Sequence, residues 1–279
     1  MQTLIDQFVA NLLDDIKANR LKLPILPEVA IRVRDAVSNE DSSAGKVAKI
    51  VGSDAALASR LLQVANSPLF RGAAKIESVQ NAIARLGVPQ VRNLVTSLIM
   101  KQLYQTKSSI LKKRMQQLWE HSTEVAAISN ILARKFTKLK ADEAMLGGLI
   151  HDIGVLPILV KAEDVPELAN NEAALDEVIR KLHAPIGRLI LESWKFPAEL
   201  VAVAAHHEDL QRNSEQVDYV DVVMVANLHS YIGSNHPHAG GNWANIPAFA
   251  KLNLTPDQSI KALEEAKDAM AEMKALLVA

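Results

Sequence analysis

Six residues with metal-binding side chains recur on apolar segments of this 279-residue sequence. They are His121, the neighbours His151 and Asp152, His183, and the neighbours His206 and His207. Imidazole nitrogens combined with a carboxylate oxygen suit Fe, Mn, Zn or Ni, and suit Ca less well. A divalent metal held in this way lowers the pKa of a bound water and orients a phosphate oxygen. As a set, the six residues predict a divalent-metal site.

Each residue also has a structural interpretation when it is considered alone. His121 falls on the apolar stripe of a helix predicted over residues 111–136, where a core histidine bonded to a neighbour is the alternative. His151 and Asp152 interrupt a strongly apolar segment, and a buried hydrogen-bonded pair or a helix cap is the alternative for them. Both alternatives require a polar partner, because burying an imidazole or a carboxylate without one is unfavourable.

The other histidines lie near predicted helix ends or in loops. His183 comes two residues before Pro185, which predicts a helix start with His183 near its N-cap. His206 and His207 follow an apolar run, where a solvated pair at a helix end is the alternative to a ligand role. Three more histidines lie in or near a polar loop and are predicted to be solvated: His229, His236 and His238.

The composition predicts that helices position these residues. The chain has only 11 glycines and 11 prolines, and 4% of its residues are aromatic. Strand-rich folds need many turns and favour aromatic and β-branched residues, so an all-β fold is disfavoured and an all-α fold is expected. Residues 218–232 are predicted as an apolar helix, with a pair of strands as the alternative because the segment is rich in valine.

Several helix boundaries can be predicted from capping residues. Ser53 or Asp54 is expected to cap one helix, and Ser78 the helix before Gly87. Residues 172–182 and about 185–194 are predicted as two separate helices. Residues 255–258 have a capping-box pattern, which predicts a helix that continues to the C-terminus.

Charge and cysteine content exclude several functional classes. The net charge is −1, so there is no overall basic field for nucleic acid or anionic lipid. The absence of cysteine excludes disulfides, thiolate ligands and iron–sulfur clusters. The first residues are typical of an amphipathic helix rather than a signal peptide, and no transmembrane span is predicted. A cytoplasmic protein with no membrane partner is expected.

The motifs around the histidines resemble those of a known family. HDIG, HAPIG and HHED, preceded by LPILPEVA, IVGSDAALASRLLQVANSPLF and IESVQNAIARLGVPQVRNLV, are similar to the HDOD family. That family is related to the HD-GYP phosphodiesterases within the HD superfamily of metal-dependent phosphohydrolases. The resemblance covers about residues 20–212. It implies a bacterial protein of signal transduction and an HD-superfamily-like helical bundle with an N-terminal helical subdomain.

The resemblance divides the chain into parts. It implies an N-terminal helix (1–19), an HDOD domain (20–212) and a C-terminal helical extension (213–279). The HDOD domain would combine an N-terminal helical part (20–110) with an HD-like part (111–212).

Residue by residue, the resemblance implies roles for the metal-binding set. His121 matches the first HD ligand, and His151 and Asp152 match the HD pair, in which Asp152 would also be the catalytic residue of an active enzyme. His183 matches a further HD-GYP histidine, and His206 and His207 match the histidine pair that follows. Three features depart from the HD-GYP pattern: Val155 replaces a basic residue, the GYP loop is absent, and Asn227, a weak ligand or supporting residue, replaces the closing aspartate.

Two functions follow from this resemblance. One is a regulatory signal-transduction protein with a partly retained metal site and a signalling protein as partner. The other is an active metal-dependent phosphohydrolase whose ligand is a nucleotide or another phosphoester. A third interpretation, DNA binding, rests on NAIARLGVPQVRNLV, which has the outline of a helix-turn-helix. The packing of two core helices explains that segment better, so no DNA partner is expected.

Overall fold

The structure is a computed structural model that describes residues 1–38, 44–67, 70, 75–234, 236–239 and 242–278. All regular elements in these residues are helices, which confirms the predicted all-α class. The first part of the chain forms α1 (Gln2–Lys17), α2 (Glu28–Ser38), α3 (Ala44–Gly52), α4 (Ala55–Asn66), α5 (Val79–Leu86), α6 (Val88–Met100) and the short 3-10 helix η1 (Lys101–Tyr104).

The remaining helices carry the histidines and the C-terminal part. The middle of the chain forms α7 (Ser109–Phe136), α8 (Ala141–Ile150), α9 (Val155–Ala162), α10 (Pro166–Ala169), α11 (Glu172–Ser193) and α12 (Ala198–His206). The last part forms α13 (Tyr219–Ser230), the 3-10 helix η2 (Trp243–Asn245), α14 (Pro247–Lys251), α15 (Pro256–Glu265) and α16 (Lys267–Val278).

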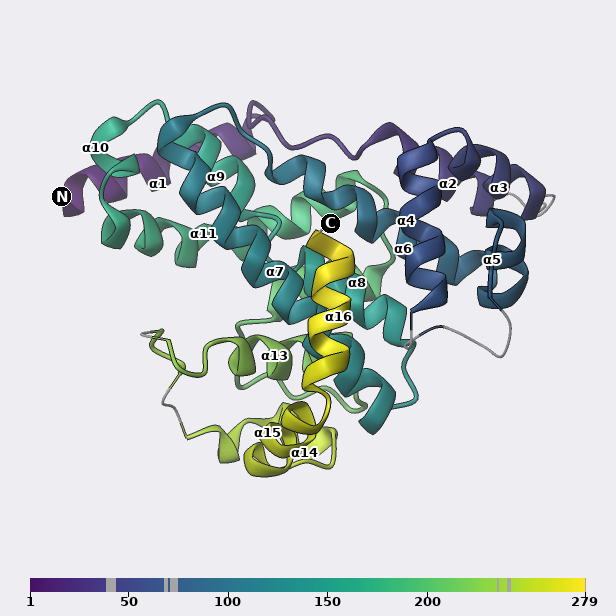
Figure 1. Cartoon of the computed structure of the whole chain (residues 1–279). Coiled ribbons are helices and arrows are strands. Elements are labelled where there is room, and N and C mark those ends of the chain that lie inside the picture. The colour runs from purple at the N-terminus through teal and green to yellow at the C-terminus, as the bar shows by residue number, and fades with distance from the viewer. Residues whose placement is uncertain (39–43, 68–69, 71–74, 235, 240–241, 279) are drawn as a thin grey trace.

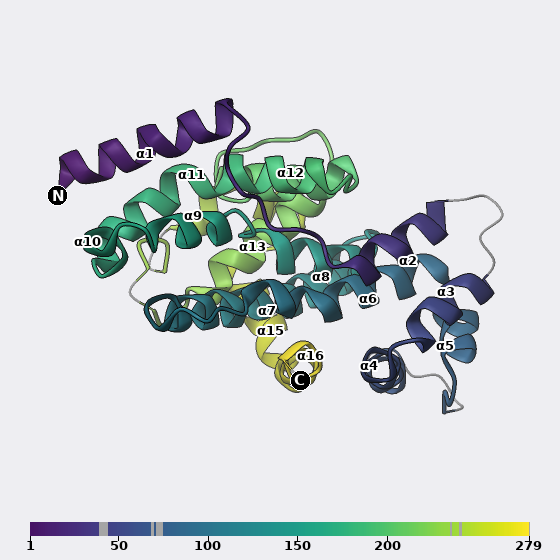
Figure 2. The same cartoon turned by 90° about the horizontal axis from the view of Figure 1, so that it is seen from above.

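The long helix α7 lies at the centre of the molecule (Figure 1). It packs against α8, α13 and α16, so segments far apart in sequence meet on one helix. Helices α2 to α6 form a group on one side, and α1 lies on the opposite side against α11 (Figure 2). One buried apolar cluster joins the α2–α6 group to α7, α8 and α11, and a second joins α7 to α13, α14 and α15.

The predicted caps are largely confirmed. Asp54 accepts a hydrogen bond from the Leu57 amide at 3.0 Å and begins α4, and Ser78 accepts one from the Asn81 amide at 3.1 Å and begins α5. Gly87 ends α5 with φ 82°, a left-handed conformation that favours glycine. The capping box at Thr255 is present. The segment 218–232 is helical, and its own capping box begins α13 at Asp218.

Two predicted boundaries are wrong. Residues 172–193 form one helix with Pro185 inside it, so His183 lies in mid-helix rather than at an N-cap. The buried stripe Val178, Leu182, Ile186 and Ile190 keeps a four-residue spacing across the proline, and its packing outweighs the lost backbone hydrogen bond. The C-terminal helix is also divided, at Ala266, where the chain turns and α16 packs along α7.

Among the described residues, one segment is long and apolar enough to cross a membrane. This segment comprises residues Ala141–Ala162, yet 83% of the apolar 18-residue stretch within it is buried inside the protein. The segment contains α8, α9 and the polar turn with Asp152 between them. This burial is typical of core helices, and α8 accordingly packs against α6, α7, α12 and α13.

His229 is buried rather than solvated, contrary to the prediction from its neighbouring loop. It lies in the last turn of α13, 6% exposed, and its ring meets Trp243 edge-on. The Ser259 hydroxyl donates to the Pro256 carbonyl, so it accepts from His229 Nε2–H at 2.8 Å. Burial lowers the pKa of His229 to about 4. The C-terminal segment that covers this histidine is distant in sequence, so the local pattern did not indicate burial.

This buried histidine predicts an acid-sensitive contribution to stability. Below its ordinary pKa of 6.5, the unfolded chain gains a proton at His229 that the folded chain does not gain until about pH 4. Between pH 7 and pH 5, the free energy of unfolding should therefore fall by about 2 kcal/mol on account of this residue. Urea unfolding at both pH values should show a smaller fall for His229→Gln than for the unmodified protein. Equal falls would contradict the prediction.

Candidate metal centre

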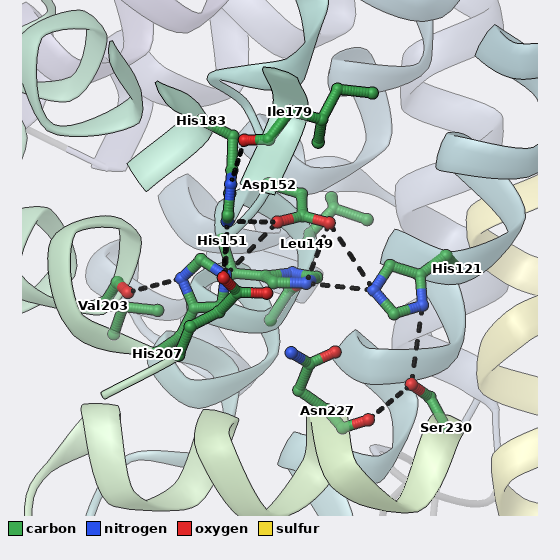
Figure 3. Close-up of polar contacts among 12 residues, drawn as sticks. His121, Leu149, His151, Asp152, Ile179, His183, Val203, His207, Asn227 and Ser230 are labelled. Atoms are coloured by element: carbon green, nitrogen blue, oxygen red, sulfur yellow. Dashed lines mark hydrogen bonds and ion pairs between the residues drawn. The ribbon is translucent and has the colours of Figure 1, made fainter. Parts of the chain in front are cut away.

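Five of the six predicted ligands meet where four helical segments converge (Figure 3). His121 comes from α7, and His151 and Asp152 from the turn between α8 and α9. His183 comes from the middle of α11, and His207 from the C-terminal end of α12. Helix α13 lies below this group and brings Asn227 and Ser230 towards it.

Asp152 is the centre of the arrangement. Its Oδ2 lies 3.6 Å from His121 Nε2 and 3.5 Å from His151 Nε2. Its Oδ1 lies 3.3 Å from His207 Nε2 and 3.5 Å from His183 Nε2. The donors therefore form two groups, each of two imidazoles and one carboxylate oxygen, with Asp152 shared between them. Such a set can hold one ion in either group, or two ions bridged by the carboxylate.

Backbone carbonyls set the tautomers of the three buried imidazoles. The pairs are His151 Nδ1 with Gly148 O at 2.7 Å, His183 Nδ1 with Ile179 O at 2.7 Å, and His207 Nδ1 with Val203 O at 3.1 Å. A carbonyl only accepts, so each Nδ1 carries the hydrogen and each Nε2 of the neutral ring presents a lone pair to Asp152. This is the usual arrangement of a metal-binding histidine, whose second nitrogen is hydrogen-bonded.

His121 has the same orientation through a hydroxyl group. Ser230 Oγ donates to the Asn227 carbonyl at 2.7 Å, so it can accept from His121 Nδ1–H at 3.4 Å. Tyr231 stacks on the His121 ring, with centroids 5.5 Å apart and planes 12° apart. Sequence reasoning did not assign Ser230 or Tyr231 to the site, and no motif in the sequence indicates them.

The residues fit a metal cation. His121 Nε2 and His151 Nε2 are 3.1 Å apart, and His183 Nε2 and His207 Nε2 are 3.2 Å apart. At such distances a shared hydrogen or a cation is needed between two lone pairs. Asn227 Oδ1 is also buried, with no hydrogen-bond partner in the part of the chain that the structure describes. Its amide is drawn beside the group in Figure 3. A cation would satisfy the facing nitrogens.

The electrostatics of the centre also suit a cation. Burial would raise the pKa of Asp152, but the surrounding histidines, His151 above all, hold it well below its usual value. Burial lowers the pKa of His151 to about 3 and also lowers that of His121. Burial opposes protonation of His207 as well, yet the hydrogen bond that its protonated ring donates to Asp152 raises its pKa. At neutral pH the centre therefore contains an ionised carboxylate beside the neutral rings of His121 and His151, and this negative charge favours a cation.

The family model of the HDOD domain matches residues 23–210. The chain belongs to the HDOD family. Its N-terminal helices and its histidine centre both lie largely inside the matched range, whereas α13, with Asn227 and Ser230, lies beyond it. The domain boundaries expected from the sequence stay a prediction.

Solved structures support the same fold for this HDOD protein. A candidate metal-dependent phosphohydrolase from Shewanella amazonensis is 32% identical, with a TM-score of 0.85, over 98% of this chain and 99% of that one. An HDOD domain protein of unknown function from Geobacter sulfurreducens is 19% identical, with a TM-score of 0.69, over 98% of each chain. This second similarity concerns the fold alone.

Two curated relatives are longer proteins. An uncharacterized protein from Treponema pallidum is 23% identical over 243 residues, which are 82% of this chain and 45% of the relative. Ribonuclease Y from Chlorobaculum tepidum is 27% identical over 181 residues, which are 64% of this chain and 30% of the relative. The chain thus spans less than half the length of these relatives.

His206 is the predicted ligand that the structure does not bring to the metal centre of this HDOD protein. Its side chain is exposed, whereas His207 is 1% exposed and faces Asp152. Neighbouring helical residues point about 100° apart, so only one of the two can face the centre. Val155, at the position expected to be basic in related proteins, is 4% exposed and part of the core.

Glu208 is a charged neighbour of the centre that sequence reasoning left unassigned. Its Oε2 lies 3.7 Å from His183 Nε2, and its side chain is 31% exposed. The HHED sequence contains this carboxylate, so its position directly after the histidine pair was an available signal.

The adjacent histidines allow a matched test of the site. We expect His207→Gln to weaken metal binding at least about 10-fold, because it removes a buried donor. We expect His206→Gln to leave metal binding unchanged, because that side chain is exposed. Calorimetric titration of both metal-free variants with Mn²⁺ and Zn²⁺ would measure the difference. Equal losses in the two variants would contradict the assignment of His207.

Proposed function

We propose that this HDOD protein is a regulatory signal-transduction protein that binds a divalent metal, Fe, Mn, Zn or Ni, at the His–Asp centre. The convergence of four imidazole Nε2 atoms on Asp152 supports this proposal most directly. No thiolate is available in the chain, so imidazole, carboxylate and water would have to complete the coordination. A signalling protein is the proposed partner, and the cytoplasm is the proposed compartment.

The ligands would form two metal-binding groups that share Asp152. His121 and His151 would hold a metal at Asp152 Oδ2, and His183 and His207 would hold one at Oδ1. The backbone carbonyls and Ser230 keep the imidazoles oriented before the metal arrives, which reduces the ordering required on binding. When bound, the metal would supply Lewis acidity and lower the pKa of a coordinated water.

The polar groups available near the centre support the regulatory function. Val155 is buried and apolar, so it offers no positive charge to a phosphate. Asn227 offers a neutral amide in place of a carboxylate. A phosphoester would have to be held by the metal and by neutral groups, with less stabilisation of its negative charge.

A metal-dependent phosphohydrolase is the second candidate function. The Shewanella relative is described as a candidate enzyme of this kind, and ribonuclease Y acts on RNA by its name. The side chains of His121 and Asp152 are 21% and 15% exposed, so solvent reaches the centre. A nucleotide or another phosphoester is the proposed substrate class.

DNA binding gains little support. The segment with a helix-turn-helix outline forms α5 and α6, and most of α6 from Val91 onwards is buried. The absence of a DNA or membrane partner stays a prediction.

Elemental analysis combined with an activity panel tests both candidates. Protein purified without added metal would be analysed for Fe, Mn, Zn and Ni and assayed on phosphomonoesters, phosphodiesters and cyclic dinucleotides. Stoichiometric metal without turnover is the result expected for the regulatory function. Turnover that Asp152→Ala abolishes would support the enzyme instead. Background metal, together with no binding on titration, would overturn both.

A further inference from the structure

A cavity of about 500 Å³ lies between the α2–α6 group and the helices that carry the metal centre. Its apolar lining includes Leu26 and Ala30 on one side and Leu146 and Leu200 on the other. The loop between α11 and α12 contributes Lys195, Phe196 and Pro197. The cavity volume is within the range of small-molecule sites, about 300–1,000 Å³.

The acidic residues around this cavity have partners within the chain. Asp35 is bound to Arg34 at 2.8 Å, and Arg34 also donates to the Trp194 carbonyl at 2.6 Å. Glu143 accepts from Lys140 at 3.2 Å and from the Tyr219 hydroxyl at 2.8 Å. Both acidic groups are therefore neutralised or hydrogen-bonded by residues of the chain itself.

Two cationic side chains at the cavity have no acidic partner among the described residues. Arg92 donates through Nε to the Asn93 amide oxygen at 3.2 Å and takes part in no ion pair with the residues that the structure describes. Lys195 is exposed and has no side-chain hydrogen bond or ion pair in that part of the chain. An apolar lining with two unpaired cations suits an organic anion.

Lys195 also has an unfavourable backbone conformation. Its φ is 55°, and the other non-glycine residues with positive φ in the described ranges are Asn19 and Asn253. Asparagine tolerates this region, whereas lysine does not favour it. Lys195 and Phe196 donate to Glu192 O and Leu191 O at the end of α11, an arrangement that usually has glycine at this position. The chain thus has a positively charged side chain at a position where glycine would adopt the backbone conformation at a lower cost in free energy.

We propose that this cavity binds a small organic anion with an apolar body. Arg92 and Lys195 would recognise its carboxylate or phosphate group, and Leu146 and Leu200 would contact its apolar part. The site is distinct from the metal centre, because none of the metal-binding residues lines it. Helix α8 lines the cavity with Glu143 and Leu146, and α12 lines it with Leu200. These helices lead to His151 and His207, about 7–12 Å further along their axes at 1.5 Å per residue.

Titration with the fluorescent anion 8-anilinonaphthalene-1-sulfonate tests this site on the whole chain. We expect saturable binding of one probe per chain. Arg92→Gln and Lys195→Gln should each weaken probe binding about tenfold, the usual effect of losing one charge-assisted contact. Lys267→Gln removes an exposed charge elsewhere and should leave the affinity unchanged. Unchanged affinity in both cavity variants, or no saturable binding, would overturn the proposal.

Lys195→Gly separates the binding role from a structural one. Because glycine tolerates positive φ, this variant should raise the melting temperature by about 2–4 °C while it weakens probe binding. Loss of both stability and binding would overturn the binding role, since it would indicate that the side chain supports the fold.

Competition identifies the ligand class. Octanoate or octyl phosphate should displace the probe, and the stronger competitor distinguishes a carboxylate from a phosphate ligand. Neutral 1-octanol at the same concentration should displace less probe. Equal displacement by octanol would overturn the requirement for an anion.

Discussion

Asp152→Asn is expected to weaken metal binding at both halves of the centre by at least about 100-fold. Both donor groups share this carboxylate, one oxygen each, so a single substitution removes the negative charge from both. Substitutions of residues that merely orient a ligand already weaken metal binding by about 10–100-fold. His121→Gln, in contrast, removes a donor from only one group and should leave the group of Asp152, His183 and His207 able to bind.

Metal content after purification and calorimetric titration of the metal-free protein would measure this effect. Asp164→Asn is a matched control, because Asp164 is an exposed aspartate outside both donor groups. We expect circular dichroism to show that both variants are folded. Metal content in Asp152→Asn equal to that of the unmodified protein would exclude Asp152 as the shared ligand.

Gly154→Ala is expected to destabilise the protein by about 3 kcal/mol or more and to impair the centre. A Cβ atom at this position would lie 1.9 Å from the His183 carbonyl oxygen and 2.5 Å from the Gly187 nitrogen. Both atoms belong to the backbone of α11, so the clash requires the helix or the turn to shift. Because Asp152 and His183 lie on the two sides of this contact, such a shift would also separate metal ligands.

Urea unfolding and metal titration would measure the two consequences of Gly154→Ala. Gly52→Ala is the control, since a Cβ atom there has no neighbour within 4 Å in the described part of the chain. We expect the control to change the free energy of unfolding by less than about 1 kcal/mol. If Gly154→Ala were as stable as the control, the close approach of the turn to α11 would be disproved.

The sequence alone was sufficient to predict the helical class and most helix starts. These features depend on local interactions, such as the apolar spacing of α7 and the hydrogen bonds from Asp54 and Ser78 to nearby amides. The residue types likewise predicted a metal site of nitrogen and oxygen donors, because cysteine is absent.

Local signals were insufficient where packing outweighed them. Pro185 indicated a helix start, but the buried stripe on both sides of it keeps α11 continuous. His229 lies beside a polar loop, but Ser259 and Trp243, both from later in the chain, bury it. In each case the deciding contacts are distant in sequence.

The tertiary structure alone decided how the candidate ligands are arranged. It brings His207 to Asp152 and leaves His206 in solvent, although the two residues are neighbours of the same type. It also supplies the carbonyls and the Ser230 hydroxyl that orient the imidazoles, and the close contact that requires Gly154. Helical periodicity determines which residues share a face of one helix. The distance between side chains on different helices depends on how those helices pack, which the local sequence pattern does not encode.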